Sequence, residues 1–147
     1  MAKLLFHSDL PFINEHLKHE RVQPYFNGGQ PIEIQDTINT IFYKSDDEKD
    51  IACFERLDQR VHAGHNAFTN NIKQALINAK DIISHHFMLF PNLELIVGYT
   101  PYNLTKTRLF NIKLGFKLVN LQYNQNDTLC YRYELRRDYF EANTKRI

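Results

Sequence analysis

The 147-residue chain is poor in the residues that cross-link small proteins. It has only two cysteines, Cys53 and Cys130, and their spacing fits neither a disulfide framework nor a zinc site. Both lie in apolar, strand-like runs, so we expect buried thiols in a reducing compartment. Because 43% of the residues are hydrophobic, we expect a single domain, residues 1–147, built around an ordinary packed core.

Long hydrophobic runs and a secretory signal are also absent. No stretch approaches the roughly 20 apolar residues of a membrane span. The apolar start of the chain is interrupted by polar residues at positions 7–9. We therefore expect a soluble, cytoplasmic protein without a membrane partner.

A strong net charge is missing as well. The formal charge is +1, which does not indicate nucleic acid or an acidic membrane as a partner. From residue 101 onward, however, nine basic residues stand against four acidic ones. This stretch is either a solvated face or a contact for a phosphate-bearing ligand or an acidic partner. Strand packing explains its interleaved tyrosines better than base stacking does, so nucleic acid is not expected as a partner.

Hydrophobic periodicity predicts a helix followed by three strands in the first half of the chain. The helix begins at residues 8–11, where a capping residue precedes a proline, and runs toward residues 21–22. The strands are predicted at residues 40–43, 51–57 and 61–68. Charged or polar turns separate them, which favours an antiparallel meander. Gly64 in the third strand marks a bulge or a close approach.

The second half predicts a helix, a strand, a helix and a hairpin. An amphipathic helix capped by Thr69 or Asn70 runs to Pro91, and an apolar strand follows at residues 93–99. The next helix covers residues 104–114 and stops at Gly115. The hairpin pairs residues 117–123 with 128–135 around a turn at 124–127. The fold class is α/β (α+β): a mixed, mostly antiparallel sheet with helices on both faces, in the order α-β-β-β-α-β-α-β-β.

This order resembles the GNAT (N-acetyltransferase) superfamily over nearly the whole chain. The resemblance rests on Thr100-Pro101-Tyr102-Asn103 after a strand and on Gly115-Phe116 after the next helix. Residues 9–22, His65, Thr100-Pro101 and residues 134–139 are similar to small GNAT-like proteins encoded by bacteriophages. The resemblance implies an acetyl-CoA-dependent N-acyltransferase with its cofactor between the strands at 61–68 and 93–99.

The resemblance also implies where the cofactor binds. Family members hold the pyrophosphate of acetyl-CoA on an Arg/Gln-x-x-Gly-x-Gly/Ala loop at a helix N-terminus. The matching stretch is residues 71–76, with Gln74 and Leu76 in place of the two glycines. Because these side chains add bulk where phosphate approaches the backbone, a weakened acetyl-CoA site is implied. The alternative is a surface helix without a cofactor. The implied cofactor-binding residues are Ala67, Phe68, Lys73, Gln74, Ala75 and Asn103, the last of which either caps the helix or contacts CoA.

Many family members carry a tyrosine acid four residues before the glycine of Gly-Phe. That position is Asn111 here, or Phe110 if the register slips by one, and neither side chain donates a proton as tyrosine does. Tyr99 and Tyr102, at the end of the preceding strand, could substitute for it only with a different geometry.

The candidate catalytic bases are His65 and Glu55, because both come from strands that would lie under the acceptor site. Histidine in addition titrates near neutral pH. The alternative for His65 is a hydrogen-bonded structural role. His62 lies three residues away and therefore faces the other side of the strand, so no metal site is expected.

The sequence therefore indicates an N-acyltransferase-like GNAT protein, with an amine as acceptor, whose activity is reduced or lost. The alternative is a non-catalytic phage-type GNAT-fold protein. Such a protein would act as a virion-associated or assembly component, or as a host-directed binding component. Its partner would be a phage or host protein, and it would reside in the host cytoplasm or the virion.

Overall fold

A computed structural model describes residues 1–124 and 127–144, so residues 125 and 126 of the predicted turn lie outside the described residues. The strands are β1 (Lys3–Leu5), β2 (Thr40–Lys44), β3 (Asp50–Arg56), β4 (Val61–Phe68), β5 (Leu95–Pro101), β6 (Lys117–Tyr123) and β7 (Leu129–Arg136). The helices are α1 (Leu10–Leu17), α2 (Ile72–Leu89), α3 (Thr105–Leu114) and α4 (Arg137–Thr144), with 3₁₀ turns at His7–Asp9 and Asn27–Gly29.

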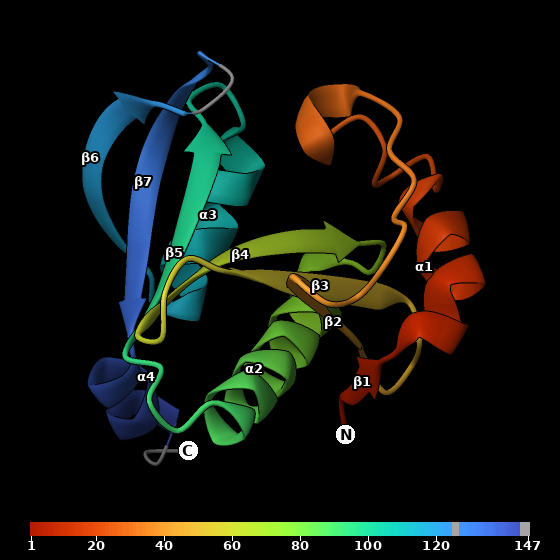
Figure 1. Cartoon of the computed structure of the whole chain (residues 1–147). Helices are drawn as coiled ribbons and strands as arrows, with labels where there is room; N and C mark the ends of the chain where they lie inside the picture. Colours follow the sequence, from red (N-terminus) through yellow and green to blue (C-terminus); the bar gives the residue numbers. More distant parts are fainter. Residues whose placement is uncertain (125–126, 145–147) are drawn as a thin grey trace.

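The seven strands form one sheet in the order β1-β2-β3-β4-β5-β7-β6 (Figure 1). All neighbouring pairs are antiparallel except β4 and β5, which run parallel across the α2 connection. The predicted mixed, mostly antiparallel sheet is confirmed.

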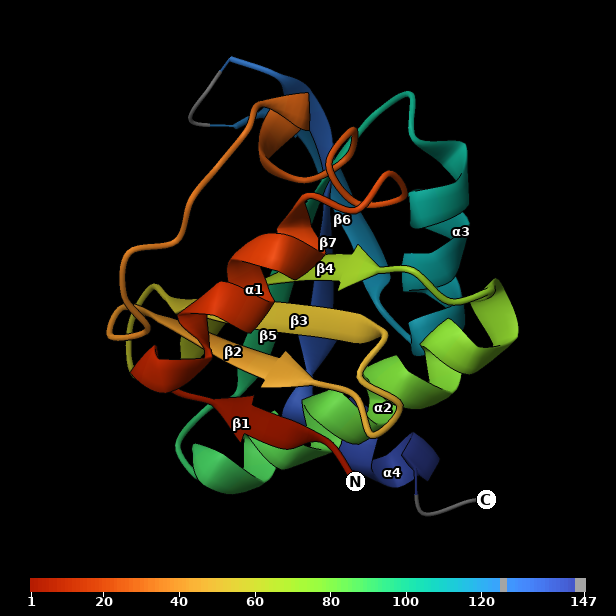
Figure 2. The same ribbon diagram turned by 90° about the vertical axis from the view of Figure 1, so that its right-hand side faces the viewer.

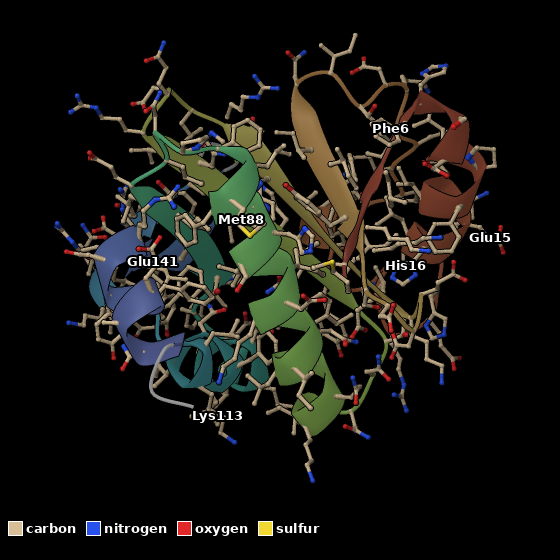
Figure 3. All side chains as sticks on the ribbon, turned by 90° about the horizontal axis from the view of Figure 1, so that it is seen from below. Phe6, Glu15, His16, Met88, Lys113 and Glu141 are labelled. Atoms are coloured by element: carbon tan, nitrogen blue, oxygen red, sulfur yellow. The ribbon has the colours of Figure 1, made fainter. Side chains whose placement is uncertain are left out.

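Helices cover both faces of the sheet. One core contains buried residues of α2, α3 and α4, such as Ile82, Phe110 and Phe140. The second core packs α1 residues, including Ile13, against Cys53 of β3. Figure 2 shows α1 in front of the sheet, and Figure 3 places His16 on α1 and Met88 on α2, with strands between the two helices.

The predicted order lacked two elements. The short edge strand β1 pairs antiparallel with β2, and α4 follows β7 directly. Three residues carry too little periodicity to announce a strand, so β1 is defined by its partner rather than by its own sequence. The Arg137 guanidinium fixes α4, because it donates to the carbonyls of Phe87, Phe90 and Leu93 at the end of α2 and beyond.

The predicted first helix is too long, since α1 ends at Leu17. The Arg21 N–H donates to Nδ1 of His19 at 3.1 Å, which is a local bond that competes with helix continuation. The strand predicted at residues 93–99 begins two residues later, because Leu93 closes the turn after α2 through its N–H bond to the Phe90 carbonyl.

Both glycines singled out in the sequence have steric reasons. Gly115 ends α3 in the left-handed region at φ 102°. Gly64 keeps regular pairing, so it is a close approach rather than a bulge. A Cβ at Gly64 would lie 3.3 Å from Cγ2 of Ile96 on the neighbouring strand.

The cysteine prediction is confirmed as far as burial is concerned. Cys53 and Cys130 are both buried and free. Burial in the α1 core, with a smaller effect of Glu55, raises the pKa of Cys53 to about 12, which makes an unreactive thiol. Within the described residues, no helix has the length and apolar character needed to cross a membrane.

Candidate functional site

The parallel strands β4 and β5 separate along their length. They pair only over Val61–Ala63 and Leu95–Val97. Beyond that point β4 continues to pair with β3, and β5 continues to pair with β7. The carboxyl-terminal halves of the two strands therefore present facing edges that are not paired with each other (Figure 1). Polar backbone groups on such edges can bind a ligand that enters between the strands.

A row of four paired residues crosses the α1-side face of the sheet beside this opening. Directly paired residues share a face, so Glu55, Ala63, Val97 and Glu134 line up across β3, β4, β5 and β7. Ala63 and Val97 are buried, whereas the two carboxylates stand at either end of the row. The small central residues thus separate two acidic positions, one on each side of the opening.

The structure brings the two predicted catalytic residues together. His65 follows on the same face of β4 as Ala63, and its Nε2 lies 3.8 Å from Oε2 of Glu55. Their side chains are 46% and 54% exposed, so both can meet a solute. Partial desolvation of this half-exposed ring lowers the pKa of His65 below its ordinary value, although the neighbouring Glu55 opposes this shift. A neutral imidazole at neutral pH is suited to accept a proton.

A second polar cluster on this face contains Tyr99, which the sequence offers as a substitute acid, together with Arg132 and Glu134, which were not predicted as site residues. The Arg132 guanidinium donates to the Tyr99 hydroxyl at 2.9 Å and to Oε2 of Glu134 at 3.0 Å. Tyr99 lies on β5 directly opposite Arg132 on β7, so register alone creates the contact. The alternation of polar residues along β7 is the sequence signal that could have indicated it. Across the opening from His65, the cluster supplies a phenol and a carboxylate held in place.

The α3 residue that aligns with the family's acid has a structural role. The amide of Asn111 donates to Oγ1 of Thr100 on β5 at 2.8 Å, and both residues are buried. The neighbouring Phe110 is also buried, and its ring meets Phe68 of β4 edge to face at 5.6 Å. These contacts tie α3 to β5 and β4. Neither Asn111 nor Phe110 offers a proton to the opening.

Ala67 and Phe68 lie at the end of β4, where the resemblance implies contact with the thioester. Ala67 is buried, and its carbonyl accepts a hydrogen bond from Nε2 of His16 on α1 at 2.6 Å. Arg21 donates in the same way to the carbonyl of Thr69. The N-terminal segment therefore clamps the end of β4 from the α1 side.

The connection from β4 to α2 is short and internally bonded. Only residues 69–71 join Phe68 to Ile72. The N–H groups of Thr69 and Asn70 both donate to Oδ1 of Asp50, at 2.8 and 3.1 Å. The predicted caps Thr69 and Asn70 are wrong, because Asn71 is the N-cap and its side chain accepts from the Gln74 N–H at 3.0 Å.

The remaining predicted cofactor residues lie apart from one another. Lys73 is exposed in the first turn of α2. The Gln74 side chain turns along the helix and donates to Oδ1 of Asn78 at 3.0 Å. Ala75 is buried in the core beneath the helix, and Leu76 packs against the same core. The bulk of Gln74 and Leu76 is thus directed along and beneath α2.

Asn103 stands exposed before α3, whose N-cap position is Leu104 without a side-chain cap. The prediction that Asn103 caps the helix is therefore wrong. In the part of the chain that the structure describes, no group of three or more His, Cys, Asp or Glu residues is placed to hold a metal ion.

This architecture is the GNAT fold, and the comparisons identify solved neighbours. No protein-family model and no curated protein matches the sequence. The aminoglycoside acetyltransferase AAC(6')-Ib in complex with coenzyme A superposes with a TM-score of 0.78 at 14% identity, covering 98% of each chain. The Vibrio cholerae spermidine N-acetyltransferase in complex with CoA and spermine gives 0.75 at 13% identity, covering 96% of this chain and 97% of that chain. At such identity the likeness shows the fold.

Proposed function

We propose that this chain is a GNAT-fold protein of the N-acyltransferase type in which transfer from acetyl-CoA to an amine is reduced or lost. What carries the proposal is the environment of Asn111. Its buried amide is committed to Thr100, at the position where the resemblance requires a tyrosine acid. Proton transfer by a positioned side chain typically contributes about 10²–10⁴-fold to a rate. Loss of this group alone therefore supports slow transfer rather than none.

The general base, in contrast to the general acid, is present in the proposed enzyme. His65 and Glu55 lie together on the α1-side face of the sheet, and a neutral His65 can accept a proton from an amine. The carboxylate of Glu55 on this face favours a cationic acceptor, whereas the charge of Glu134 is offset by its ion pair with Arg132. The fold neighbours bound to kanamycin and to spermine support an amine as the acceptor class.

The test is an assay of acetyl transfer from acetyl-CoA to spermine and to kanamycin. The rate is measured through the free thiol of the CoA that the transfer releases. Wild type is expected to turn over far below the common enzyme range of about 1–10³ per second. His65→Gln and Glu55→Gln are expected to abolish the residual rate, whereas the exposed His7→Gln is the matched control. Turnover within the common range would contradict the proposal.

A second candidate is a non-catalytic binding protein on the same scaffold. The observation that favours it is the β4–α2 connection, whose N–H groups at Thr69 and Asn70 are bonded within the chain. We propose that, in this role, the chain is a phage-type protein that acts as a virion-associated, assembly or host-directed binding component. Its partner would be a phage or host protein, and it would reside in the host cytoplasm or the virion. Co-purification with a defined phage or host protein supports it. Acetyl transfer that disappears in His65→Ala counts against it.

A further inference from the structure

The α3 side of the last strand of the sheet exposes apolar side chains. Leu118 of β6 pairs with Tyr133 of β7, and Leu121 pairs with Tyr131, so these side chains share one face of the sheet. Cζ of Arg108 on α3 lies 3.8 Å from the centroid of the Tyr131 ring, and its Nε donates to the Tyr133 hydroxyl at 3.2 Å. Helix α3 therefore runs over β7, and the two leucines of β6 lie beside it.

Helix α3 adds two further apolar side chains to this face. Ile112 lies one turn after Arg108 on the same side of the helix, and Leu109 precedes it by three residues. We define the α3–β6 surface as five apolar residues with exposed fractions from 48% to 67%: Leu109, Ile112, Leu118, Leu121 and Tyr123. Exposed apolar patches that are rimmed by polar groups mark interaction sites on proteins. This surface is therefore suited to a partner.

The outer edge of β6 is less suited to binding than this face. β6 is the last strand in the sheet order, and Figure 1 shows it curving at the edge. Its register with β7 shifts between Leu118 and Asn120, so Val119 is an extra, bulged residue. A bulge interrupts the row of N–H and C=O groups on which another strand would pair. A partner is therefore expected to pack on the face rather than to extend the sheet.

Basic side chains border the α3–β6 surface. Residues 102–123 contain no aspartate or glutamate. Lys106 and Lys113 are exposed on α3, three residues before and four residues after Leu109, so they flank it. Two copies of this surface packed face to face would bring one basic rim against another, which like-charge repulsion opposes. An acidic partner would instead pair with the same cations.

The basic rim also favours a protein over a lipid surface. Segments that bind anionic membranes carry clusters of roughly four to eight cations. Here Arg108 is already bonded to Tyr133, and Nζ of Lys117 lies 4.6 Å from the centroid of the Tyr139 ring. That leaves the two lysines of α3 to meet an anionic partner, which suits a few carboxylates better than a charged bilayer.

We propose that the α3–β6 surface binds an acidic, amphipathic helix of a partner protein. The apolar stripe of such a helix would cover the exposed side chains of α3 and β6, and carboxylates beside the stripe would meet Lys106 and Lys113. The inference goes beyond the proposed function, because this surface lies on the α3 side of the sheet, whereas His65 and Glu55 lie on the α1 side. It holds whether or not the chain transfers acetyl groups.

The experiment uses a synthetic helical peptide with a leucine stripe flanked by glutamates, and a counterpart with lysines in place of the glutamates. Fluorescence anisotropy measures both affinities, and amide-resolved NMR locates the contact. Wild type is expected to bind the glutamate peptide about tenfold or more tightly, with shifts confined to α3 and β6. Lys113→Glu should weaken binding about threefold, and Ile112→Glu about tenfold. Lys18→Glu, exposed at the end of α1 on the other face, is the matched control and should bind as wild type does.

Equal affinity for the two peptides, or no binding of the glutamate peptide at millimolar concentration, overturns the proposal. A concentration-dependent dimer that Ile112→Glu abolishes also overturns it, because a second copy would then occupy the surface. Binding to phosphatidylserine vesicles in preference to the peptide does the same. If Ile112→Glu does not fold, Lys113→Glu decides, since that lysine is exposed. Weaker binding than that of Lys18→Glu then supports the proposal, and equal binding overturns it.

Discussion

A chain of three buried polar rings makes the stability of this protein sensitive to acid. The Tyr43 hydroxyl lies 2.8 Å from Nδ1 of His86, and Nε2 of His86 lies 2.7 Å from Nδ1 of His62. Phe54 stacks on the His86 ring with centroids 3.8 Å apart. The ring of His86 is fully buried, so each of its nitrogens has its partner inside the core. Adding a proton to either imidazole would place a cation among aromatic rings.

The magnitude follows from the pKa of His86. Burial, with smaller effects from His62, Arg56 and Arg137, lowers this pKa to about 3. In the unfolded chain the ring has its ordinary pKa near 6.5. Between these values the unfolded state binds more protons, so the free energy of unfolding falls as the pH drops below 6.5. Linkage gives a loss of about 2 kcal/mol between pH 7 and pH 5 from His86 alone.

Urea denaturation at a series of pH values measures this loss. Wild type is expected to lose about 2 kcal/mol or more between pH 7 and pH 5, since burial also lowers the pKa of His62. His86→Phe keeps the stack on Phe54 and removes the titrating ring, so its stability should change less over the same interval. The exposed His7→Gln should follow wild type. Equal pH dependence in wild type and His86→Phe would refute the reasoning.

Three further predictions concern single positions. Gly115→Ala should lower the free energy of unfolding by about 1–2 kcal/mol in urea, because φ is 102° and the new Cβ would meet the Tyr139 ring at 3.2 Å; an unchanged midpoint would rule this out. Asn71→Ala should lower it by about 1 kcal/mol by leaving the Gln74 N–H uncapped, while Asn71→Asp should keep most of it. As the pH is lowered, the rate of any residual acetyl transfer should stay constant until the pH is below the ordinary pKa of histidine, and then fall. The reason is that His65 must be neutral to accept a proton, and its pKa is lowered. A pH profile of wild type that His65→Gln leaves unchanged would exclude this role.

The elements that sequence predicts best here are those whose pattern is local and long. Helix α2 repeats apolar residues at helical spacing until Pro91 stops it, and β4 was placed at its observed bounds. Strand β1 and helix α4 have no such pattern. They depend on contacts with residues far along the chain, such as the bonds from Arg137 to carbonyls after α2. Tertiary bonds of this kind leave no periodic trace in the sequence.

The residues of the candidate site also differ in whether they can be predicted from a local pattern or depend on distant contacts. His65 and Glu55 could be nominated because neighbouring strands of a meander bring alternate residues onto one face. Asp50 could not be nominated, because its contacts with Thr69 and Asn70 cross 19 and 20 residues and depend on the length of the β4–α2 connection. A charged residue in a hairpin turn ordinarily faces solvent.

The fold can persist without the chemistry in this scaffold, because the same polar groups can either bind a ligand or form hydrogen bonds within the protein. An open phosphate site requires N–H groups that stay unsatisfied by protein until the ligand arrives, which lowers the stability of the ligand-free protein. Here Asp50 holds the N–H groups of Thr69 and Asn70 just before α2, and Asn71 caps the Gln74 N–H. In the same way, the Asn111 amide donates to the buried hydroxyl of Thr100. The Asp50 bonds tie β3 to the connection before α2, and the Asn111 bond ties α3 to β5. The chain therefore keeps the GNAT architecture through interactions that do not depend on a bound cofactor, at the positions where the family's cofactor loop and acid would stand.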